Sequence, residues 1–296
     1  MKKTYKQYEV LEWASLFLEK NEREPNVAKI LLEHVLNVDQ STFYMNMQMP
    51  ISDEQVKSYE NLIHIHVETG EPVQHLLGYA HFFGRKFSVN EHVLIPRQET
   101  EELVDLTLKK IDENFSRNES LVVVDVGTGS GVIGTTLALE HEQLDVYATD
   151  ISERALEVAK ANATQLGAHV QFLQGNFLQP IINNQTYPQI IVSNPPYIAY
   201  REKDHLSDTV KNYDPDLALF AENDGLAAYE TILKQIANHF TSVSLIMFEI
   251  GYTQGVRVTK LIKSFFPNST VEIIKDINGQ DRIVSAYLEH EFSSDD

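Results

Sequence analysis

The string Asn194-Pro195-Pro196-Tyr197 contains the residue types best suited to chemistry on a planar nitrogen. Asn194 offers a side-chain carbonyl, and Pro195 offers a backbone carbonyl without an N–H of its own. These two oxygens can accept both hydrogens of an NH₂ group, while the Tyr197 ring provides a flat face for stacking. An amide or aromatic amine nitrogen is a poor nucleophile, so fixing its hydrogens aims it at an electrophile. We therefore predict that Asn194, Pro195, Pro196 and Tyr197 form the catalytic string. The structural alternative is a stiff strand exit, which two prolines alone would also give.

A second candidate site is the glycine loop Asp125-Val126-Gly127-Thr128-Gly129-Ser130-Gly131, which follows an apolar run and precedes a helix. Glycine lets the backbone turn tightly and lets a ligand lie against the main chain. An acidic residue followed by Gly-x-Gly-x-Gly favours a loop that wraps the methionine part of S-adenosylmethionine. Gly129-x-Gly131-x-x-Gly134 also matches the dinucleotide fingerprint. An NAD-dependent oxidoreductase remains an alternative, although it leaves Asn194–Tyr197 without a role.

Two further positions at strand ends extend this predicted cofactor site. Asp150 would accept hydrogen bonds from both ribose hydroxyls, although a helix N-cap is its plainer role. Asn176 would hydrogen bond to the adenine and Phe177 would stack on it. The cofactor-binding residues predicted from the pattern are therefore Gly127, Thr128, Gly129, Ser130, Gly131, Asp150, Asn176 and Phe177.

Strands and helices alternate from residue 121 onward, which predicts a doubly wound, mostly parallel α/β sheet. We expect strands at 121–124, 144–148, 170–173, 189–193, 244–249, 271–275 and 282–287. The helices between them are expected at 132–140, 153–166, 226–239 and 253–265. Only Asp276–Gln280 separates the last two strands, which is too short for a crossover helix. The last strand should therefore be antiparallel, in a hairpin at the sheet edge. The tail Ser293–Asp296 is expected to fray.

The N-terminal part has the helical period instead. Val10, Trp13, Ala14 and Phe17 have the spacing of one buried helix face, and further stripes follow Pro25 and Ser52. The period changes to alternation after Gly78 and predicts a hairpin turning near Gly84. A helix is expected from near Thr100, with Lys109-Lys110 at its C-terminus. We predict a helical domain at 1–76, a β-hairpin linker at 77–96 and a cofactor-binding domain at 97–296.

The bulk composition narrows the possible partners. The 43 acidic residues outnumber the 24 basic ones and give a formal net charge of −19, which weighs against a nucleic-acid substrate. Cysteine is absent, and His64 and His66 alternate on a helix without sharing a face, so we predict no metal site. No apolar run is long enough for a membrane helix, and the N-terminus does not match a signal peptide. We expect a cytoplasmic monomer without membrane contact.

These motifs together resemble the HemK/PrmC-type protein-(glutamine-N5) methyltransferases that modify peptide chain release factors. The likeness extends over nearly the whole chain. Besides the glycine loop and Asn194–Tyr197, the similar pieces are Pro72-Val73-Gln74 to Gly78-Tyr79, Leu94–Arg97, Glu99-Thr100-Glu101, Leu217–Leu219, Asp224–Leu226, Glu249–Gly251 and Gly279-x-Asp281-Arg282. The resemblance implies a Rossmann-like class I methyltransferase with a small N-terminal helical bundle.

The resemblance also implies a substrate and a partner. The enzyme would methylate the glutamine of the Gly-Gly-Gln motif in a release factor, leaving S-adenosylhomocysteine, and the helical domain would help to recognise that factor. Asn194 would contact the cofactor as well as the glutamine. Gln98, Asn176 and Phe177 depart from the usual family pattern. Because Asn176 can still hydrogen bond and Phe177 can still stack, their departures are expected to affect cofactor affinity rather than chemistry. The alternatives are a ribosomal-protein glutamine methyltransferase and an amino methyltransferase acting on a DNA or RNA base.

Overall fold

The computed structural model describes residues 5–116 and 120–289, so the tail predicted to fray lies outside the described residues. The chain divides into two compact units. One contains the residues up to Tyr79 together with Ser207–Tyr213, and the other contains Ala80–Leu206 and the chain from Asp214 onward. Nothing in the sequence pattern indicated that the chain returns to the first unit at Ser207.

The first unit is helical, as the sequence predicts. Its helices are α1 (Gln7–Lys20), α2 (Asn26–Leu36), α3 (Gln40–Met45), α4 (Asp53–Thr69) and α5 (Val73–Leu77), and strands β1 (Tyr5–Lys6) and β2 (Pro50–Ile51) pair antiparallel.

The buried face of α1 is rotated from the predicted one. Gln7, Val10, Ala14 and Leu18 are buried, whereas Trp13 is 37% exposed. Trp13 instead stacks on the Phe17 ring, with 5.6 Å between the ring centroids. The buried face of α1 predicted from the sequence was therefore wrong by part of a turn. An aromatic ring at the edge of a helix face can cover apolar surface without entering the core.

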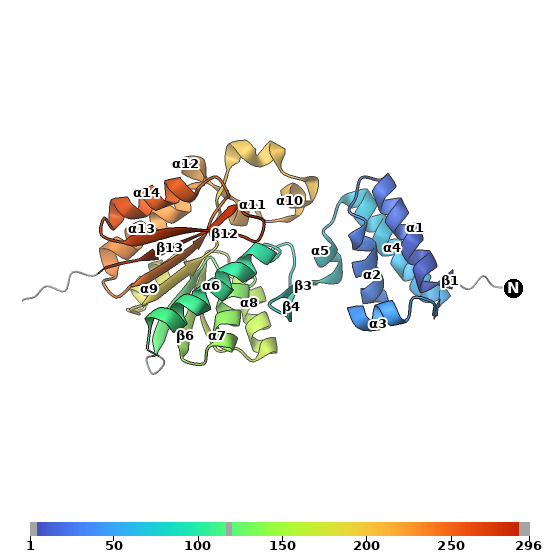
Figure 1. The fold of residues 1–296 in the computed structure, drawn as a ribbon, viewed down its shortest axis with the longest axis horizontal. Coiled ribbons are helices and arrows are strands. Elements are labelled where there is room, and N and C mark those ends of the chain that lie inside the picture. The colour runs from blue at the N-terminus through green and yellow to red at the C-terminus, as the bar shows by residue number, and fades with distance from the viewer. Residues whose placement is uncertain (1–4, 117–119, 290–296) are drawn as a thin grey trace, which may run out of the picture. The chain divides into compact units, whose positions relative to one another are not determined.

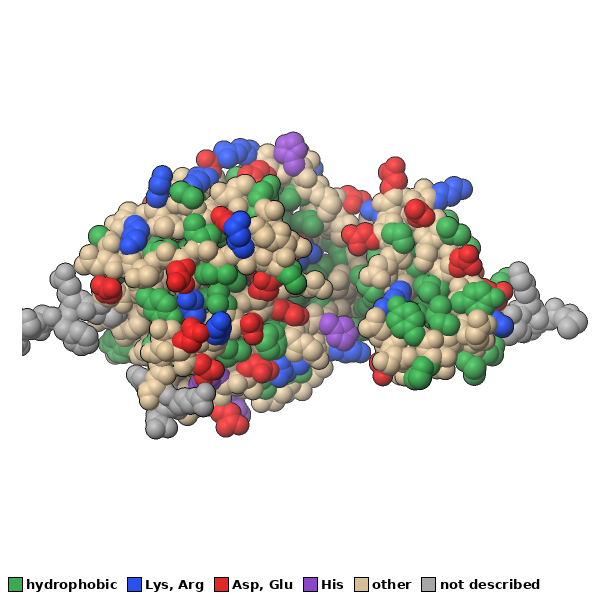
Figure 2. Space-filling view, viewed as in Figure 1, with side chains coloured by type: hydrophobic (Ala, Val, Ile, Leu, Met, Phe, Trp, Pro, Cys, Tyr) green, Lys and Arg blue, Asp and Glu red, His purple; other side chains and the backbone are tan. Residues whose placement is uncertain are grey.

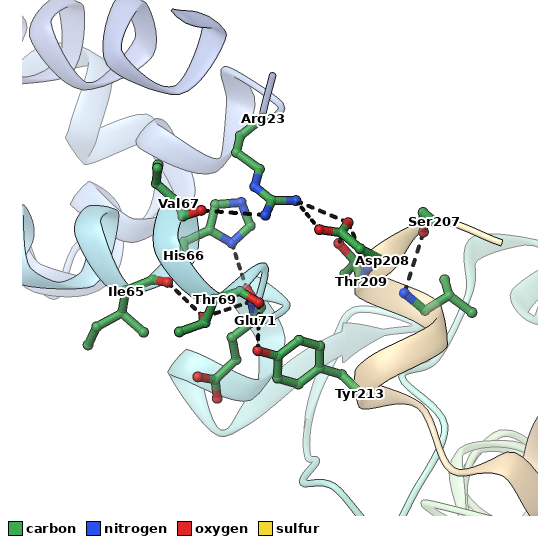
Figure 3. Close-up of polar contacts among 11 residues, drawn as sticks. Arg23, Ile65, His66, Val67, Thr69, Glu71, Ser207, Asp208, Thr209 and Tyr213 are labelled. Atoms are coloured by element: carbon green, nitrogen blue, oxygen red, sulfur yellow. Dashed lines mark hydrogen bonds and ion pairs between the residues drawn. The ribbon is translucent and has the colours of Figure 1, made fainter. Parts of the chain in front are cut away.

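The returning segment is held to the helical unit by side-chain contacts, shown in Figure 3. It forms helix α10 (Asp208–Tyr213). Arg23 Nη1 donates to Asp208 Oδ2 at 2.9 Å, and the Tyr213 hydroxyl donates to the Thr69 carbonyl oxygen at 2.8 Å. Thr69 is the last residue of α4, so Tyr213 satisfies one of the carbonyl groups that a helix C-terminus leaves without a partner.

The described part of the second unit forms a seven-stranded sheet in the order β12-β13-β11-β8-β5-β6-β7. The strands are β5 (Leu121–Val126), β6 (Leu144–Asp150), β7 (Val170–Gln174), β8 (Ile190–Ser193), β11 (Leu245–Glu249), β12 (Thr270–Lys275) and β13 (Asp281–Tyr287). The last strand, β13, is antiparallel to both of its neighbours, and the other pairings are parallel. The doubly wound fold class and its antiparallel last strand are thus confirmed.

Helices cover both faces of this sheet, as Figure 1 shows. One face is covered by α9 (Gln179–Asn183), α13 (Ala227–His239) and α14 (Gly255–Phe265), whose Ile181, Tyr229 and Val258 join one buried cluster. The other is covered by α6 (Gln98–Asn114), α7 (Val132–Glu140) and α8 (Glu153–Leu166). Side chains alternate between faces along a strand, so Val123 and Val124 of β5 enter different clusters.

The hairpin that precedes the sheet forms as predicted. Strands β3 (Tyr79–Phe82) and β4 (Arg85–Ser88) are joined by Phe83 and Gly84, which both have positive φ (50° and 72°), as a tight hairpin turn requires. Helix α6 begins slightly earlier than expected and continues to Asn114. Lys109-Lys110 therefore does not lie in its last turn, and the predicted charge order holds only at the acidic N-terminus.

The chain between β8 and α13 contains short elements that the sequence did not predict. Besides α10, they are β9 (Ile198–Ala199), the 3-10 helix η1 (Tyr200–His205), α11 (Asp216–Leu219), β10 (Phe220–Ala221) and α12 (Glu222–Gly225). Among the described helices, none has the length and apolar character needed to cross a membrane.

Candidate active site

A cavity of about 420 Å³ opens at the carboxyl ends of the central parallel strands of the second unit. Its wall includes residues that follow β5, β6, β7 and β8, which is where ligands of open α/β sheets bind. From the predicted set, the wall contains Gly127, Thr128, Gly129, Ser130, Asp150, Asn176, Phe177, Asn194 and Pro196. The structure thus brings most of the predicted cofactor residues together with part of the predicted catalytic string.

The glycine loop is anchored beneath by Asp125, the fifth residue of β5. Its Oδ2 accepts hydrogen bonds from Thr128 Oγ1 at 2.6 Å and from the Gly134 N–H at 2.9 Å. Burial raises the pKa of this carboxyl to about 6. Gly127 and Gly129 have φ of 74° and 55°, and an added Cβ at either would meet nothing within 4 Å. The loop thus needs glycine for its backbone shape and leaves space for a ligand.

Gly131 has different surroundings from Gly127 and Gly129. It is absent from the cavity wall, and its φ of 82° places it at the start of α7. An added Cβ would lie 2.9 Å from Cβ of Ala159 in α8. Gly131 therefore permits close packing between two helices.

Asp150 ends β6 and ties the glycine loop to the next turn. Its Oδ2 accepts from the Gly129 N–H at 2.9 Å and its Oδ1 from the Ser152 N–H at 2.8 Å. Burial raises the pKa of Asp150. Helix α8 is capped by Ser152, whose Oγ accepts from Ala155 N, so Asp150 is not its N-cap. Each carboxylate oxygen keeps a lone pair that can accept a ligand hydroxyl.

The turn after β7 presents Asn176 and Phe177 to the cavity. Phe177 has a φ of 51°, which is rare for a bulky residue and costs conformational energy. The turn is nevertheless supported, because Gln235 Oε1 accepts from the Leu178 N–H at 2.9 Å and Gln235 Nε2 donates to the Asn176 carbonyl oxygen. A strained aromatic residue held at a cavity wall is consistent with a functional position.

The predicted catalytic string is divided between the cavity and the core. Asn194 and Pro196 line the cavity, whereas Pro195 and Tyr197 do not. The Tyr197 ring packs against the larger core cluster, and its carbonyl oxygen accepts from Gln254 Nε2 at 2.9 Å. Gly225 approaches the same carbonyl so closely that an added Cβ would lie 2.0 Å from it. The backbone conformation after Pro196 is thus fixed by its neighbours.

Asn194 contacts a buried polar pair that the sequence analysis did not assign to the site. Its Nδ2 donates to Thr100 Oγ1 at 3.3 Å, and Thr100 Oγ1 donates to Glu249 Oε2 at 2.7 Å. Thr100 and Glu249 are 3% and 1% exposed. Burial raises the pKa of Glu249 to about 7, opposed by the Thr100 hydrogen bond and by the charge of Arg282. Burial likewise raises the pKa of the Tyr197 hydroxyl.

Arg97 lines the cavity and is held by an acid from far along the chain. Its Nη2 lies 2.7 Å from Oδ2 of Asp214, whose side chain is 2% exposed. A half-exposed guanidinium held by a buried carboxylate gives the cavity one fixed positive group.

The sequence contained a positional signal for Glu249, whereas Arg97 appeared only within the family-like piece Leu94–Arg97. Glu249 follows the apolar run Leu245–Phe248, and a charged residue at the carboxyl end of a buried parallel strand lies at the ligand edge of the sheet. Arg97 directly precedes α6 as its N-cap residue. Asp214 lay in a stretch where no element was predicted, so its pairing with Arg97 had no local signature.

The wall residues fit S-adenosylmethionine. The loop glycines leave room against the main chain, Asp150 offers acceptors for two hydroxyls, and Phe177 offers an aromatic face. The cavity volume lies within the usual range for small-molecule sites, roughly 300–1,000 Å³. In the part of the chain that the structure describes, no group of three or more His, Cys, Asp or Glu side chains is placed to hold a metal ion.

Comparison with known proteins gives consistent results. Residues 9–78 match the model of the PrmC N-terminal domain, and residues 100–212 match that of the methyltransferase small domain. The chain is 46% identical over 95% of its length to the release factor glutamine methyltransferase of Bacillus cereus, of which it covers 99%. It is 43% identical over 95% of its length to that of Bacillus subtilis, covering 97% of it.

Solved structures agree on the fold. The catalytic domain of hMettl16 in complex with an RNA hairpin has a TM-score of 0.55 at 13% identity, covering 81% of this chain and 82% of that one. The N-terminal domain of human METTL16 in complex with SAH has a TM-score of 0.53 at 12% identity, covering 87% and 94%.

Proposed function

We propose that this chain, which belongs to the release factor glutamine methyltransferase family, transfers a methyl group from S-adenosylmethionine to a glutamine side-chain amide of a peptide chain release factor. The glutamine is the one in the Gly-Gly-Gln motif. One observation carries the proposal beyond family membership: the glycine loop and Asn194 line the same cavity. A cofactor held by the loop would therefore lie beside the group that receives the substrate nitrogen.

The cofactor assignment follows the cavity wall. Gly127 to Ser130 would hold the methionine part, Asp150 the ribose hydroxyls, and Asn176 with Phe177 the adenine, while Asn194 would lie near the reacting end. Gly131 would act by packing α7 against α8. When bound, S-adenosylmethionine supplies an electrophilic methyl group that passes to the amide nitrogen, leaving S-adenosylhomocysteine.

The substrate assignment rests on the acceptors at the strand exit. Asn194 Oδ1, in the cavity wall, would accept one amide hydrogen. The backbone carbonyl of Pro195, a residue outside the cavity wall, would have to turn toward the substrate to accept the other, and Pro196 would keep the two acceptors at a fixed separation. These contacts strengthen as positive charge develops on the nitrogen in the transition state, so they favour reaction rather than mere binding. Tyr197 would support the string through its place in the core, because its ring does not line the cavity.

The helical domain, predicted at 1–76 and joined in the structure by Ser207–Tyr213, is assigned to recognition of the release factor. Residues 77–96 are assigned as the linker and the remainder of 97–296 as the catalytic domain. The protein would act as a cytoplasmic monomer without direct contact to nucleic acid. Its net charge of −19 supports a protein substrate over a nucleic-acid base. On the face shown in Figure 2, acidic side chains are scattered among the basic ones, and the described residues there form no continuous basic stripe.

The test uses labelled S-adenosylmethionine with a purified release factor in one reaction and with ribosomal proteins, total tRNA, rRNA or DNA in parallel reactions. Peptide mapping then locates the label. Label on the glutamine of the Gly-Gly-Gln peptide supports the proposal. Label confined to a ribosomal-protein glutamine or to nucleic acid would keep the chemistry and overturn the substrate.

A further inference from the structure

One polar feature of the cavity wall has no assigned role. It is the chain of hydrogen bonds that begins at Asn194 and continues through Thr100, which also lines the cavity. It runs through Thr100 in the first turn of α6 to Glu249 at the end of β11. These residues are far apart in the sequence, and two of them are almost fully buried. The number of hydrogens that each group in this chain can donate determines how the Asn194 amide is oriented.

A threonine hydroxyl has one hydrogen to donate and lone pairs with which to accept. An ionised carboxylate can only accept, so Thr100 must direct its single hydrogen at Glu249. Thr100 Oγ1 can then only accept from Asn194, and the Asn194 atom that faces it must be the NH₂ group. Asn194 Oδ1 is consequently turned away from Thr100 and stays available as an acceptor.

We propose that Glu249 and Thr100 are positioning residues that, acting in series, fix the side-chain amide of Asn194 so that its carbonyl oxygen receives the substrate amide. The inference rests on the proposed function, because it assigns a purpose to the orientation of Asn194. Without the chain, the amide of Asn194 can rotate and present NH₂ to the substrate NH₂, which places donor against donor.

The protonation state of Glu249 controls which group donates in each hydrogen bond between Glu249, Thr100 and Asn194. A protonated Glu249 donates to Thr100, which frees the Thr100 hydrogen to point at Asn194 Oδ1. The groups around Glu249 are Arg282 on β13, Arg97 and Glu99 at the start of α6, and the hydroxyls of Tyr197 and Tyr229. Tyr229 donates to the Glu249 backbone oxygen and leaves the carboxylate untouched. Burial raises the pKa of Glu249 to about 7. As the pH rises through neutrality, Glu249 therefore ionises, so that Thr100 donates to it and accepts from the Asn194 NH₂ group.

Turnover of the release factor by purified variants tests the inference. Thr100→Val removes the hydroxyl and keeps the shape, and it should lower kcat about tenfold, the effect of one typical hydrogen bond, with the cofactor Kd unchanged. Thr100→Ser restores the hydroxyl and should recover most of kcat. Thr107→Val is the matched control, because Thr107 is also buried in α6 but donates to the Leu103 carbonyl oxygen, away from the site.

A pH profile of kcat distinguishes a positioning role of Glu249 from a purely structural one, because a structural role would not change the profile. Wild type should lose rate as the pH falls below about 7. Glu249→Gln should lack that loss and turn over several-fold more slowly at about pH 8, because a neutral amide is a weaker acceptor than a carboxylate. A wild type that fails to methylate the release factor contradicts the proposed function. An active wild type with unchanged kcat in Thr100→Val, or with the same pH profile in Glu249→Gln, contradicts the positioning role alone.

Discussion

Replacement of Glu249 by glutamine should make the stability of the second unit less dependent on pH. Burial raises the pKa of Glu249 from 4.5 to about 7, so the folded state holds this proton more tightly than the unfolded state. The stabilisation is complete below about pH 4.5 and is lost as the pH rises through 7. The full rise in the pKa corresponds to about 3 kcal/mol in the free energy of unfolding. Roughly 2–3 kcal/mol of this is lost between pH 5 and 8.

Urea unfolding of wild type and Glu249→Gln at about pH 5 and pH 8 measures this difference. Between pH 5 and pH 8, the free energy of unfolding of wild type should fall by roughly 2–3 kcal/mol more than that of Glu249→Gln. The single tryptophan, Trp13, lies in the helical unit, so its fluorescence follows that unit while far-ultraviolet circular dichroism follows both. Asp125, whose pKa is also raised by burial, is present in both proteins and cancels.

The exposed Glu142→Gln in the same unit is the control, and it should follow wild type at both pH values. The unpaired amide hydrogens introduced by Glu249→Gln cost free energy that is equal at both pH values, so they do not affect the comparison. A stability difference between wild type and Glu249→Gln that stays constant from pH 5 to 8 would refute the argument that the buried carboxylate titrates near neutrality.

Three further substitutions have defined outcomes. Asn194→Ala should fold normally and lose about 10²–10³-fold in methylation rate, so an unchanged single-turnover rate would remove Asn194 from the substrate site. Asp150→Ala should weaken binding of S-adenosylmethionine most, and calorimetry showing unaltered affinity would discredit its ribose role. Arg23→Ala should increase hydrogen exchange in Ser207–Tyr213, because it removes the ion pair with Asp208. It should cost less than about 1 kcal/mol of stability, as for other surface ion pairs. Unchanged exchange would show that Tyr213 alone anchors the segment.

The sheet could be predicted from the sequence because its signals are local. Strands buried on both faces are continuous apolar runs, and helical stretches alternate with them along the chain. The glycine loop and Asp150 were placed in the cavity by topology, since consecutive parallel strands end at the same edge of the sheet. The order of the strands then brought Asn194 to the same cavity.

The rest depended on contacts between distant segments. The Arg23–Asp208 pair joins residues 185 positions apart, and neither residue differs locally from an ordinary surface charge. Gly131 and Tyr197 were given ligand contacts because motif position does not distinguish a backbone that faces a ligand from one that faces a helix or the core. Only the packing of Ala159 against Gly131 and of the core against Tyr197 decides this.

The two measurements on Glu249 also bear on why a carboxylate is buried there. An apolar or neutral side chain at the end of β11 would avoid the desolvation cost that Glu249 incurs at neutral pH, and such replacements often stabilise proteins. If the Glu249 carboxylate had no role in turnover, Glu249→Gln would avoid that desolvation cost at pH 8 with no loss of rate. A gain in stability accompanied by slower turnover would mean that the buried charge is retained because it directs the Thr100 hydrogen, and with it the amide of Asn194.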